Sequence, residues 1–345
     1  MPRVVFQGSS YEAAGQSVLD CLTARGHSVP NSCRVGVCQS CLMRAIRGAI
    51  PEKAQTGLTP TMKARGLFLA CQCFPTEDFE VALADDVIRR VEARVSAIER
   101  LNDEIRAVRL RPSSPIEYRS GQFLRLFKDA RTSRNYSLAS VPSLDDDLIL
   151  HVRRFSGGLV SGWIFEQLEP GSVVMISEAF GDCFYLTGRP RQDILLLGTG
   201  CGLAPLYGIT RDALNSGHRG RIRLYHGSRE AGGLYLTEQL RQIAAAHSNF
   251  QYRQCVSEGP PGEGHCSGTP LELALKDNPD LGGWRVYLCG NPQMVDAARM
   301  ETFLAGAASS EIFADPFLPT GTPSTPPPQI DASASTARKT SSSAT

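Results

Sequence analysis

The spacing of hydrophobic positions divides the chain into three globular segments and a tail. In residues 1–85, short apolar runs at 4–6 and 42–46 predict strands, and the alternating residues 79–83 predict a closing strand. Apolar side chains within residues 18–22 can share one face of a short helix, which Gly26 would end. A small domain of short strands with one helix is therefore expected here.

Proline and glycine recur at short intervals through the second segment, residues 86–188. Such punctuation is typical of turns between strands. Apolar runs at 122–126, 148–152 and 173–176 provide the strands, and a small antiparallel barrel is the most economical architecture. The apolar positions 87, 91, 95 and 98 also fit helical spacing, so periodicity alone leaves that stretch open between helix and strand.

The third segment, residues 189–318, alternates strands with helices. Its apolar run at 194–197 predicts a parallel strand that is buried on both faces, and further strands are expected at 221–225, 250–253 and 284–288. This order predicts a doubly wound α/β domain with a nucleotide crevice at the strand ends. Residues 319–345 consist largely of Pro, Ser, Thr and Ala and predict a disordered tail.

Composition changes the picture by what it excludes. A net charge of +1 gives no electrostatic basis for binding nucleic acid, and no apolar run approaches the ~20 residues of a membrane span. The sequence begins without the apolar stretch of a signal peptide, and its 11 cysteines are an odd number, so the cytoplasm is the expected compartment. Nothing in the pattern indicates an oligomeric state.

Four of the cysteines carry the clearest chemistry. Cys33, Cys38 and Cys41 follow the C-x4-C-x2-C spacing that wraps a [2Fe–2S] cluster, and Cys71 lies 30 positions later. Structural zinc sites usually pair two C-x2-C knuckles, whereas only one is present here. Cys73 competes with Cys71 for the fourth ligand position.

Residues 33–41 and 69–72 resemble plant-type ferredoxin domains, which are small β-grasp folds. That resemblance implies that Cys33, Cys38, Cys41 and Cys71 are the ligands and that Cys73 is a bystander. Residues 1–85 hold eight Lys/Arg and seven Asp/Glu, unlike the acidic free-standing plant ferredoxins. A carrier that docks by negative charge is therefore not expected.

The second segment contains an Arg-x-Tyr-Ser sequence, formed by Arg134, Tyr136 and Ser137. It resembles the flavin signature of the ferredoxin–NAD(P) reductase family. A guanidinium pairs well with a pyrophosphate, and a tyrosine ring can pack on the isoalloxazine. The second phosphate-binding element of the family matches His151, Val152, Arg153, Gly158, Leu159, Val160 and Ser161. This element favours FAD over FMN.

The third segment matches the pyridine-nucleotide elements of the same family. The family's glycine loop resembles the stretch with Thr199, Gly200, Gly202 and Pro205, and the resemblance implies that Ser228 and Arg229 hold the adenosine ribose. Arg229 could meet a 2′-phosphate or stack on adenine, so NADH or NADPH is expected. Cys289 and Gly290 match the Cys-Gly-x-Pro element beside the nicotinamide. Residues 311–317 resemble the family's closing strand, and this resemblance implies that Phe317 is the aromatic presented to the flavin, with Phe313 as the alternative.

The order of these motifs is similar to that of reductase components of bacterial ring-hydroxylating and other multicomponent oxygenases. It implies an enzyme, an NAD(P)H-dependent oxidoreductase, that passes electrons through FAD and a [2Fe–2S] cluster to an acceptor protein, an oxygenase component. In this scheme Tyr136, Ser137, Cys289 and Phe317 are the catalytic residues. One alternative is a reductase in a small-molecule pathway such as deoxysugar formation. Another is an iron–sulfur carrier or sensor without reductase activity.

Overall fold

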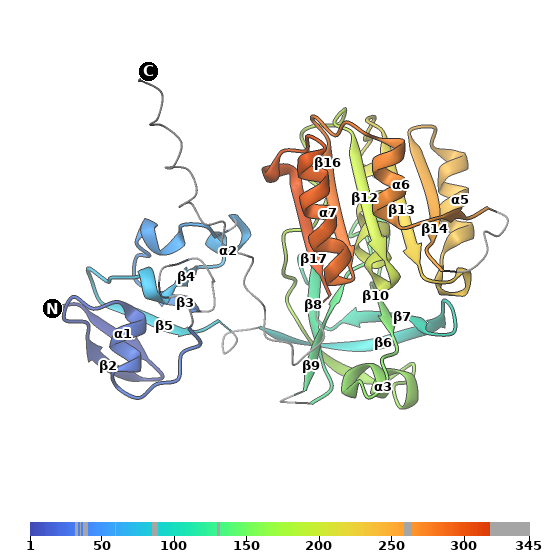
Figure 1. Ribbon diagram of the computed structural model, residues 1–345. Helices are drawn as coiled ribbons and strands as arrows, with labels where there is room; N and C mark the ends of the chain where they lie inside the picture. The colour runs from blue at the N-terminus through green and yellow to red at the C-terminus, as the bar shows by residue number, and fades with distance from the viewer. Residues whose placement is uncertain are drawn as a thin grey trace, which may run out of the picture.

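The computed structural model describes residues 1–31, 34, 36, 41–58, 60–84, 89–129, 132–258 and 264–317, which form three sheets (Figure 1). The cluster ligands predicted at positions 33 and 38, apolar position 87 and the predicted tail at 319–345 lie outside these residues. The predicted fold class, a multidomain α/β and β protein, is confirmed.

The first sheet has the strand order β2-β1-β5-β3-β4. Its strands are β1 (Arg3–Phe6), β2 (Ser9–Glu12), β3 (Leu42–Arg47), β4 (Leu67–Leu69) and β5 (Phe79–Leu83). Strand β1 runs parallel to β5 and antiparallel to β2, while β3 runs antiparallel to both β4 and β5. The helices are α1 (Val18–Thr23) and α2 (Pro60–Ala64), with short 3-10 turns η1 (Glu52–Gln55) and η2 (Ala70–Gln72).

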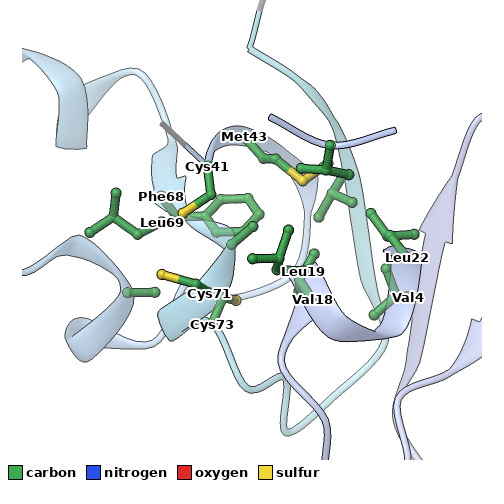
Figure 2. Close-up of a cluster of buried hydrophobic side chains, with 14 of the residues drawn as sticks. Val4, Val18, Leu19, Leu22, Cys41, Met43, Phe68, Leu69, Cys71 and Cys73 are labelled. Carbon is green, nitrogen blue, oxygen red and sulfur yellow. The ribbon is translucent and has the colours of Figure 1, made fainter. Parts of the chain in front are cut away.

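Helix α1 supplies the core of this domain. Its apolar residues Val18, Leu19 and Leu22 are buried, and Ser17 caps its start by accepting a hydrogen bond from the Asp20 backbone N–H. Figure 2 shows these side chains packed together with Met43 and Phe68 from the sheet. The helix predicted at 18–22 and the strands predicted at 4–6, 42–46 and 79–83 are therefore confirmed.

The second sheet is antiparallel, with the order β10-β7-β6-β11-β8-β9. Its strands are β6 (Arg90–Arg100), β7 (Ile105–Pro112), β8 (Phe123–Phe127), β9 (Ser133–Ser137), β10 (Leu148–Arg153) and β11 (Val173–Ser177), and helix α3 (Leu159–Glu166) follows β10. A bridge between Leu138, which directly follows β9, and Leu150 of β10 connects the two edges of the sheet, as in a barrel. The stretch that periodicity left open is strand β6, along which Val91, Ala93 and Val95 face the core in strict alternation.

The third sheet is entirely parallel, in the order β15-β14-β13-β12-β16-β17. It contains β12 (Ile194–Thr199), β13 (Ile222–Ser228), β14 (Phe250–Val256), β15 (Cys266–Ser267), β16 (Arg285–Gly290) and β17 (Ile312–Pro316). Its helices are α4 (Leu203–Asn215), α5 (Thr237–Ala246), α6 (Pro270–Asp277) and α7 (Pro292–Leu304), with 3-10 turns η3 (Gly200–Gly202), η4 (Ala231–Gly233) and η5 (Ser309–Glu311). Residues Ile194 to Leu197 of the central strand are fully buried, as the continuous apolar run predicts.

A buried polar row connects the barrel to this parallel sheet. His151 Nδ1 on β10 lies 3.2 Å from the Tyr235 hydroxyl, and the Tyr235 ring packs edge-on against both His151 and His226. His226 Nδ1 on β13 in turn lies 3.2 Å from the Tyr252 hydroxyl, while its Nε2 has no hydrogen-bond partner among the residues that the structure describes. Burial lowers the pKa of each histidine to about 3, so both imidazoles are neutral at physiological pH.

Candidate electron-transfer site

Two of the four predicted cluster ligands can be followed in the structure. Cys41 directly precedes β3 and Cys71 lies in η2, and the Ala70 N–H donates to the Cys41 carbonyl at 3.0 Å. Figure 2 shows that the Cys41 and Cys71 sulfur atoms point toward the same space. Cys33 and Cys38 lie outside the described residues.

Cys73, the competing candidate for the fourth ligand, is placed differently from Cys71. The Cys73 backbone carbonyl accepts a hydrogen bond from the Val18 N–H at 2.8 Å, which connects this segment to helix α1. The side chain is fully buried in the domain core, and burial raises the pKa of the Cys73 thiol to about 12. A neutral thiol inside a hydrophobic core is a poor metal ligand, because ligation requires the thiolate.

Gly36 shows why the cluster loop needs a glycine. Its φ of 85° lies in the left-handed region, and a Cβ there would lie 2.9 Å from Gln72 Cγ. The Gln72 side chain occupies this space and donates to the Arg34 carbonyl at 3.3 Å. Gln72 therefore connects the loop to the segment that carries Cys71. These residues fit a [2Fe–2S] cluster.

Strand β9 carries all three residues of the predicted flavin signature. Arg134 is half-buried, and within the described part of the chain its guanidinium has no carboxylate partner, donating only to the Ser133 carbonyl at 2.6 Å. Tyr136 is half-buried, and burial raises the pKa of its hydroxyl. An unneutralised guanidinium beside an aromatic ring fits a flavin phosphate and ring system.

Ser137 connects this strand to the parallel sheet. Its hydroxyl donates to Asp315 Oδ2 at 3.1 Å, although the two residues are 178 positions apart. Burial raises the pKa of the Asp315 carboxyl to about 6, and the hydrogen bond from Ser137 opposes that rise. Asp315 has no role in the sequence-based scheme. An acidic residue two positions before the closing aromatic, and hence on the same face of the strand, is the signal that could have found it.

The start of helix α3 fits a phosphate. Gly158 is the N-cap, and the first helical N–H groups, those of Leu159, Val160 and Ser161, have no intrahelical acceptor. The Ser161 hydroxyl accepts from the Phe155 N–H at 3.2 Å and thereby holds the turn in place. Free N–H groups at a helix start bind anions.

The neighbouring strand β10 carries the other predicted flavin residues. His151 and Val152 are buried, and the His151 ring is turned toward Tyr235. Arg153 donates twice to Glu104 Oε2, at 3.0 and 2.6 Å. Its Nη1 would lie 3.6 Å from a Cβ at Gly200, so Arg153 stands where the flavin and nucleotide elements meet.

The glycine loop after β12 packs against the loop after β16. The Thr199 hydroxyl accepts from the Asn291 N–H at 3.0 Å. A Cβ at Gly202 would lie 2.2 Å from the Cys289 carbonyl oxygen, so only glycine allows this approach. Gly290 ends β16 immediately before the second loop, while Pro205 is buried in the first turn of α4. The structure thus brings the Gly-Thr-Gly and Cys-Gly-x-Pro motifs together at one edge of the sheet.

Cys289 lies behind this edge with its thiol fully buried. Its Sγ is 3.5 Å from Cys183 Sγ in the barrel-to-sheet connection, and burial raises the pKa of the Cys289 thiol. In register with it on the next strand is Asp315. The thiol is therefore neutral and packs below the loop that would carry a nicotinamide.

The remaining predicted residues lie at the carboxyl ends of β13 and β17. Ser228 ends β13, and the exposed Arg229 lies 3.7 Å from Glu258. Both a guanidinium for a 2′-phosphate and a carboxylate for a ribose diol are thus present. Phe317 follows β17 and donates its N–H to the Gly290 carbonyl at 2.8 Å. Phe313 instead stacks on Tyr287 at 5.4 Å between ring centroids, which is a core contact.

Three family models match consecutive parts of the chain. A 2Fe–2S iron–sulfur cluster binding domain matches residues 5–76, an oxidoreductase FAD-binding domain residues 92–185, and an oxidoreductase NAD-binding domain residues 196–300. The sequence is 34% identical to a reductase component from Ralstonia sp, over 89% of this chain and 95% of that protein. That relative is the ferredoxin–NAD(P)+ reductase component of naphthalene 1,2-dioxygenase/salicylate 5-hydroxylase systems.

The corresponding component of the Pseudomonas putida naphthalene 1,2-dioxygenase system is also 34% identical, over 90% of this chain and 95% of its own length. The chain belongs to this family of ferredoxin–NAD(P)+ reductase components. The crystal structure of an Amycolatopsis cytochrome P450 reductase is similar as well, with a TM-score of 0.67 and 31% identity over 92% of this chain and 99% of that one. The predicted family, enzyme class and cofactors are therefore confirmed: a 2Fe–2S cluster, FAD and NAD(P)H.

Among the described residues of this reductase, no helix is long and apolar enough to cross a membrane.

Replacing Asp315 by alanine is expected to slow reduction of the bound flavin by NADH about 100-fold, because Ser137 would lose the partner that orients its hydroxyl. The unsubstituted rate should fall as the pH drops through about 6, where the Asp315 carboxyl takes up a proton, and this limb should be missing in the variant. Anaerobic stopped-flow absorbance between pH 5.5 and 8 measures both. Asp296→Ala, at an exposed position of α7, is the control. An unchanged rate in Asp315→Ala would contradict this role.

Proposed function

We propose that this reductase takes electrons from NADH or NADPH and delivers them to the oxygenase component of a multicomponent oxygenase system. When bound, FAD supplies hydride acceptance and the cluster supplies one-electron transfer. The observation that carries the proposal is the Ser137–Asp315 hydrogen bond, which joins the flavin strand of the barrel to the nucleotide edge of the parallel sheet. A carrier or sensor would not need these two edges joined at a buried polar pair.

The chain's own residues have distinct roles in this scheme. Arg134 and the N–H groups at the start of α3 bind the flavin diphosphate, while Tyr136 and Phe317 pack against its ring system. Thr199, Gly200 and Gly202 would hold the nucleotide pyrophosphate and nicotinamide, with the buried Cys289 beneath their loop. Ser228 and Arg229 hold the adenosine ribose. The Ser137 hydroxyl, held by Asp315, would contact the flavin near its reacting edge.

We further assign residues 1–85 to the cluster domain, 86–188 to the flavin domain and 189–318 to the nucleotide domain. The cluster cysteines and the buried free thiols of Cys183 and Cys289 suit a reducing compartment, and we place the protein in the cytoplasm.

The purified protein, reconstituted with iron, sulfide and FAD, is expected to bleach on addition of NADH or NADPH. It should then support turnover of an added oxygenase component of the naphthalene dioxygenase type. Comparing the two nucleotides at equal concentration gives the preference that Arg229 and Glu258 set. Failure of both nucleotides to bleach fully loaded protein would overturn the proposal. Bleaching without electron transfer to any oxygenase component would overturn the proposed acceptor and leave only the reduction of the cofactors by NADH or NADPH.

A further inference from the structure

Arg65 makes a contact that the cofactor motifs do not explain. It follows helix α2 of the cluster domain, and its side chain reaches the barrel of the flavin domain. Arg65 Nη2 donates to Glu178 Oε1 at 2.6 Å, and Nη1 donates to the Ala179 carbonyl at 3.2 Å. The guanidinium carbon also lies 3.8 Å from the centroid of the Phe180 ring. One side chain thus makes an ion pair, a backbone hydrogen bond and a cation–π contact across two domains.

The contact is partly withdrawn from solvent. The side chains of Arg65 and Glu178 are 21% and 31% exposed, which is less than most ion pairs in this protein. An ion pair gains strength when water is excluded, and a planar guanidinium can donate in its plane while it stacks on an aromatic face. Lysine could not make the same set of contacts. The geometry is therefore specific to arginine.

On the side of the cluster domain, Arg65 lies close in sequence to a predicted cluster ligand. Arg65 is separated by one residue from strand β4, and β4 leads directly into η2 with Cys71. Strand β4 is also paired with β3, which begins immediately after Cys41. The Arg65 contact is therefore connected, through β4 and β3, to the segments that carry Cys71 and Cys41.

On the side of the barrel, the contact is connected to the predicted flavin strand β9. Phe180 exchanges two backbone hydrogen bonds with Phe123, at 2.9 and 2.7 Å, and the two rings stack 5.9 Å apart. Phe123 is in turn paired in register with Ser137 across β8 and β9. Phe180, which contacts Arg65, is thus connected to Ser137 of the predicted flavin strand through one intervening residue, Phe123.

We propose that Arg65 is a positioning residue that docks the cluster domain on the flavin barrel, so that the cluster and the flavin are held at one separation. This inference rests on the proposed function, in which electrons cross between these two domains. Domains joined by a linker move relative to each other unless specific contacts hold them, and the rate of electron transfer falls steeply with distance.

The test measures the radius of gyration and two electron-transfer activities of the cofactor-loaded Arg65→Gln variant, each against the unsubstituted protein. Its radius of gyration, measured by small-angle X-ray scattering, is expected to increase. NADH-dependent reduction of cytochrome c, which draws electrons from the cluster, should fall about 10-fold. Reduction of ferricyanide, which can draw them from the flavin, should stay unchanged, as should the electron paramagnetic resonance spectrum of the reduced cluster.

Three further variants separate docking from general damage. Glu178→Gln removes the same ion pair from the barrel side and should give the same split between the two activities. The exchange Arg65→Glu with Glu178→Arg should restore part of the cytochrome c rate. Arg47→Gln, which removes an exposed arginine paired with Glu80 inside the cluster domain, should change neither shape nor activity.

An unchanged radius of gyration in both single variants, or an unchanged ratio of the two activities, would overturn the docking role. A reverse exchange that restores nothing would also count against it. If the unsubstituted protein fails to reduce either acceptor with NADH, the proposed function fails. If it reduces both and the Arg65 variant matches it, only the docking inference fails.

Discussion

Cytochrome c reduction by NADH is expected to fall to background when Cys71 is replaced by serine, while ferricyanide reduction continues. The Cys71 sulfur faces the same space as that of Cys41, and the spacing of the cysteines provides four thiolates for two irons. A serine hydroxyl is a poor substitute because Fe–S clusters are held by thiolates. The flavin and nucleotide residues lie on other sheets, so hydride transfer between their ligands should persist. Iron content and the visible spectrum report loss of the cluster.

Cys73→Ser is the matched control, because the same substitution two positions away falls in the hydrophobic core. It should keep the cluster and cytochrome c reduction, and the buried hydroxyl should lower the free energy of unfolding by about 1–3 kcal/mol. The opposite pattern, with iron lost from Cys73→Ser and retained by Cys71→Ser, would make Cys73 the fourth ligand.

Mild acid is expected to destabilise the protein through His151 and His226. The pKa of each is about 3 in the folded protein, against an ordinary value of 6.5. The unfolded chain therefore takes up protons first, and the stability that is fully present above pH 6.5 is lost progressively between pH 6.5 and pH 3. At pH 5 the loss amounts to about 2 kcal/mol for each histidine. Urea unfolding midpoints at pH 7 and pH 5 measure it.

The double substitution His151→Gln with His226→Gln should flatten this acid dependence. Glutamine can still hydrogen-bond to Tyr235 and Tyr252 but does not titrate. His247→Gln, at an exposed position, should leave the dependence unchanged. If the double variant loses as much stability between pH 7 and pH 5 as the unsubstituted protein, other groups cause the acid sensitivity.

Local patterns predicted most of the architecture. The buried run at residues 194–197 indicated a parallel strand because no polar position interrupts it, and the proline and glycine spacing of the second segment indicated antiparallel strands. The glycine motifs were informative because backbone approach demands them: at Gly202 a side chain would collide with the Cys289 carbonyl. Such constraints act over a few residues and are visible in one sequence. Residues 87–98 were ambiguous because the four-residue spacing of positions 87, 91 and 95 fits one face of a helix and also one face of a strand.

The contacts between domains could not be predicted in this way. Asp315 meets Ser137 across 178 positions, and Arg65 meets Glu178 across 113. Each of these side chains looks like an ordinary polar surface residue in its own segment, since nothing nearby shows that a distant strand covers it. His151 illustrates the same limit, because its motif marks a flavin element while its ring is turned toward Tyr235 in the nucleotide domain.

The position of Asp315 on β17 has a consequence for biosynthesis. Strand β17 is the last strand of the parallel sheet in chain order, and the ribosome makes it after every other described strand. The barrel can fold much earlier, yet its Ser137 meets Asp315 only when β17 has added to β16. A nascent chain would therefore carry a barrel that is fully synthesised but lacks this carboxylate. The Ser137 arrangement that we propose for flavin reduction should accordingly form only after β17 has left the ribosome.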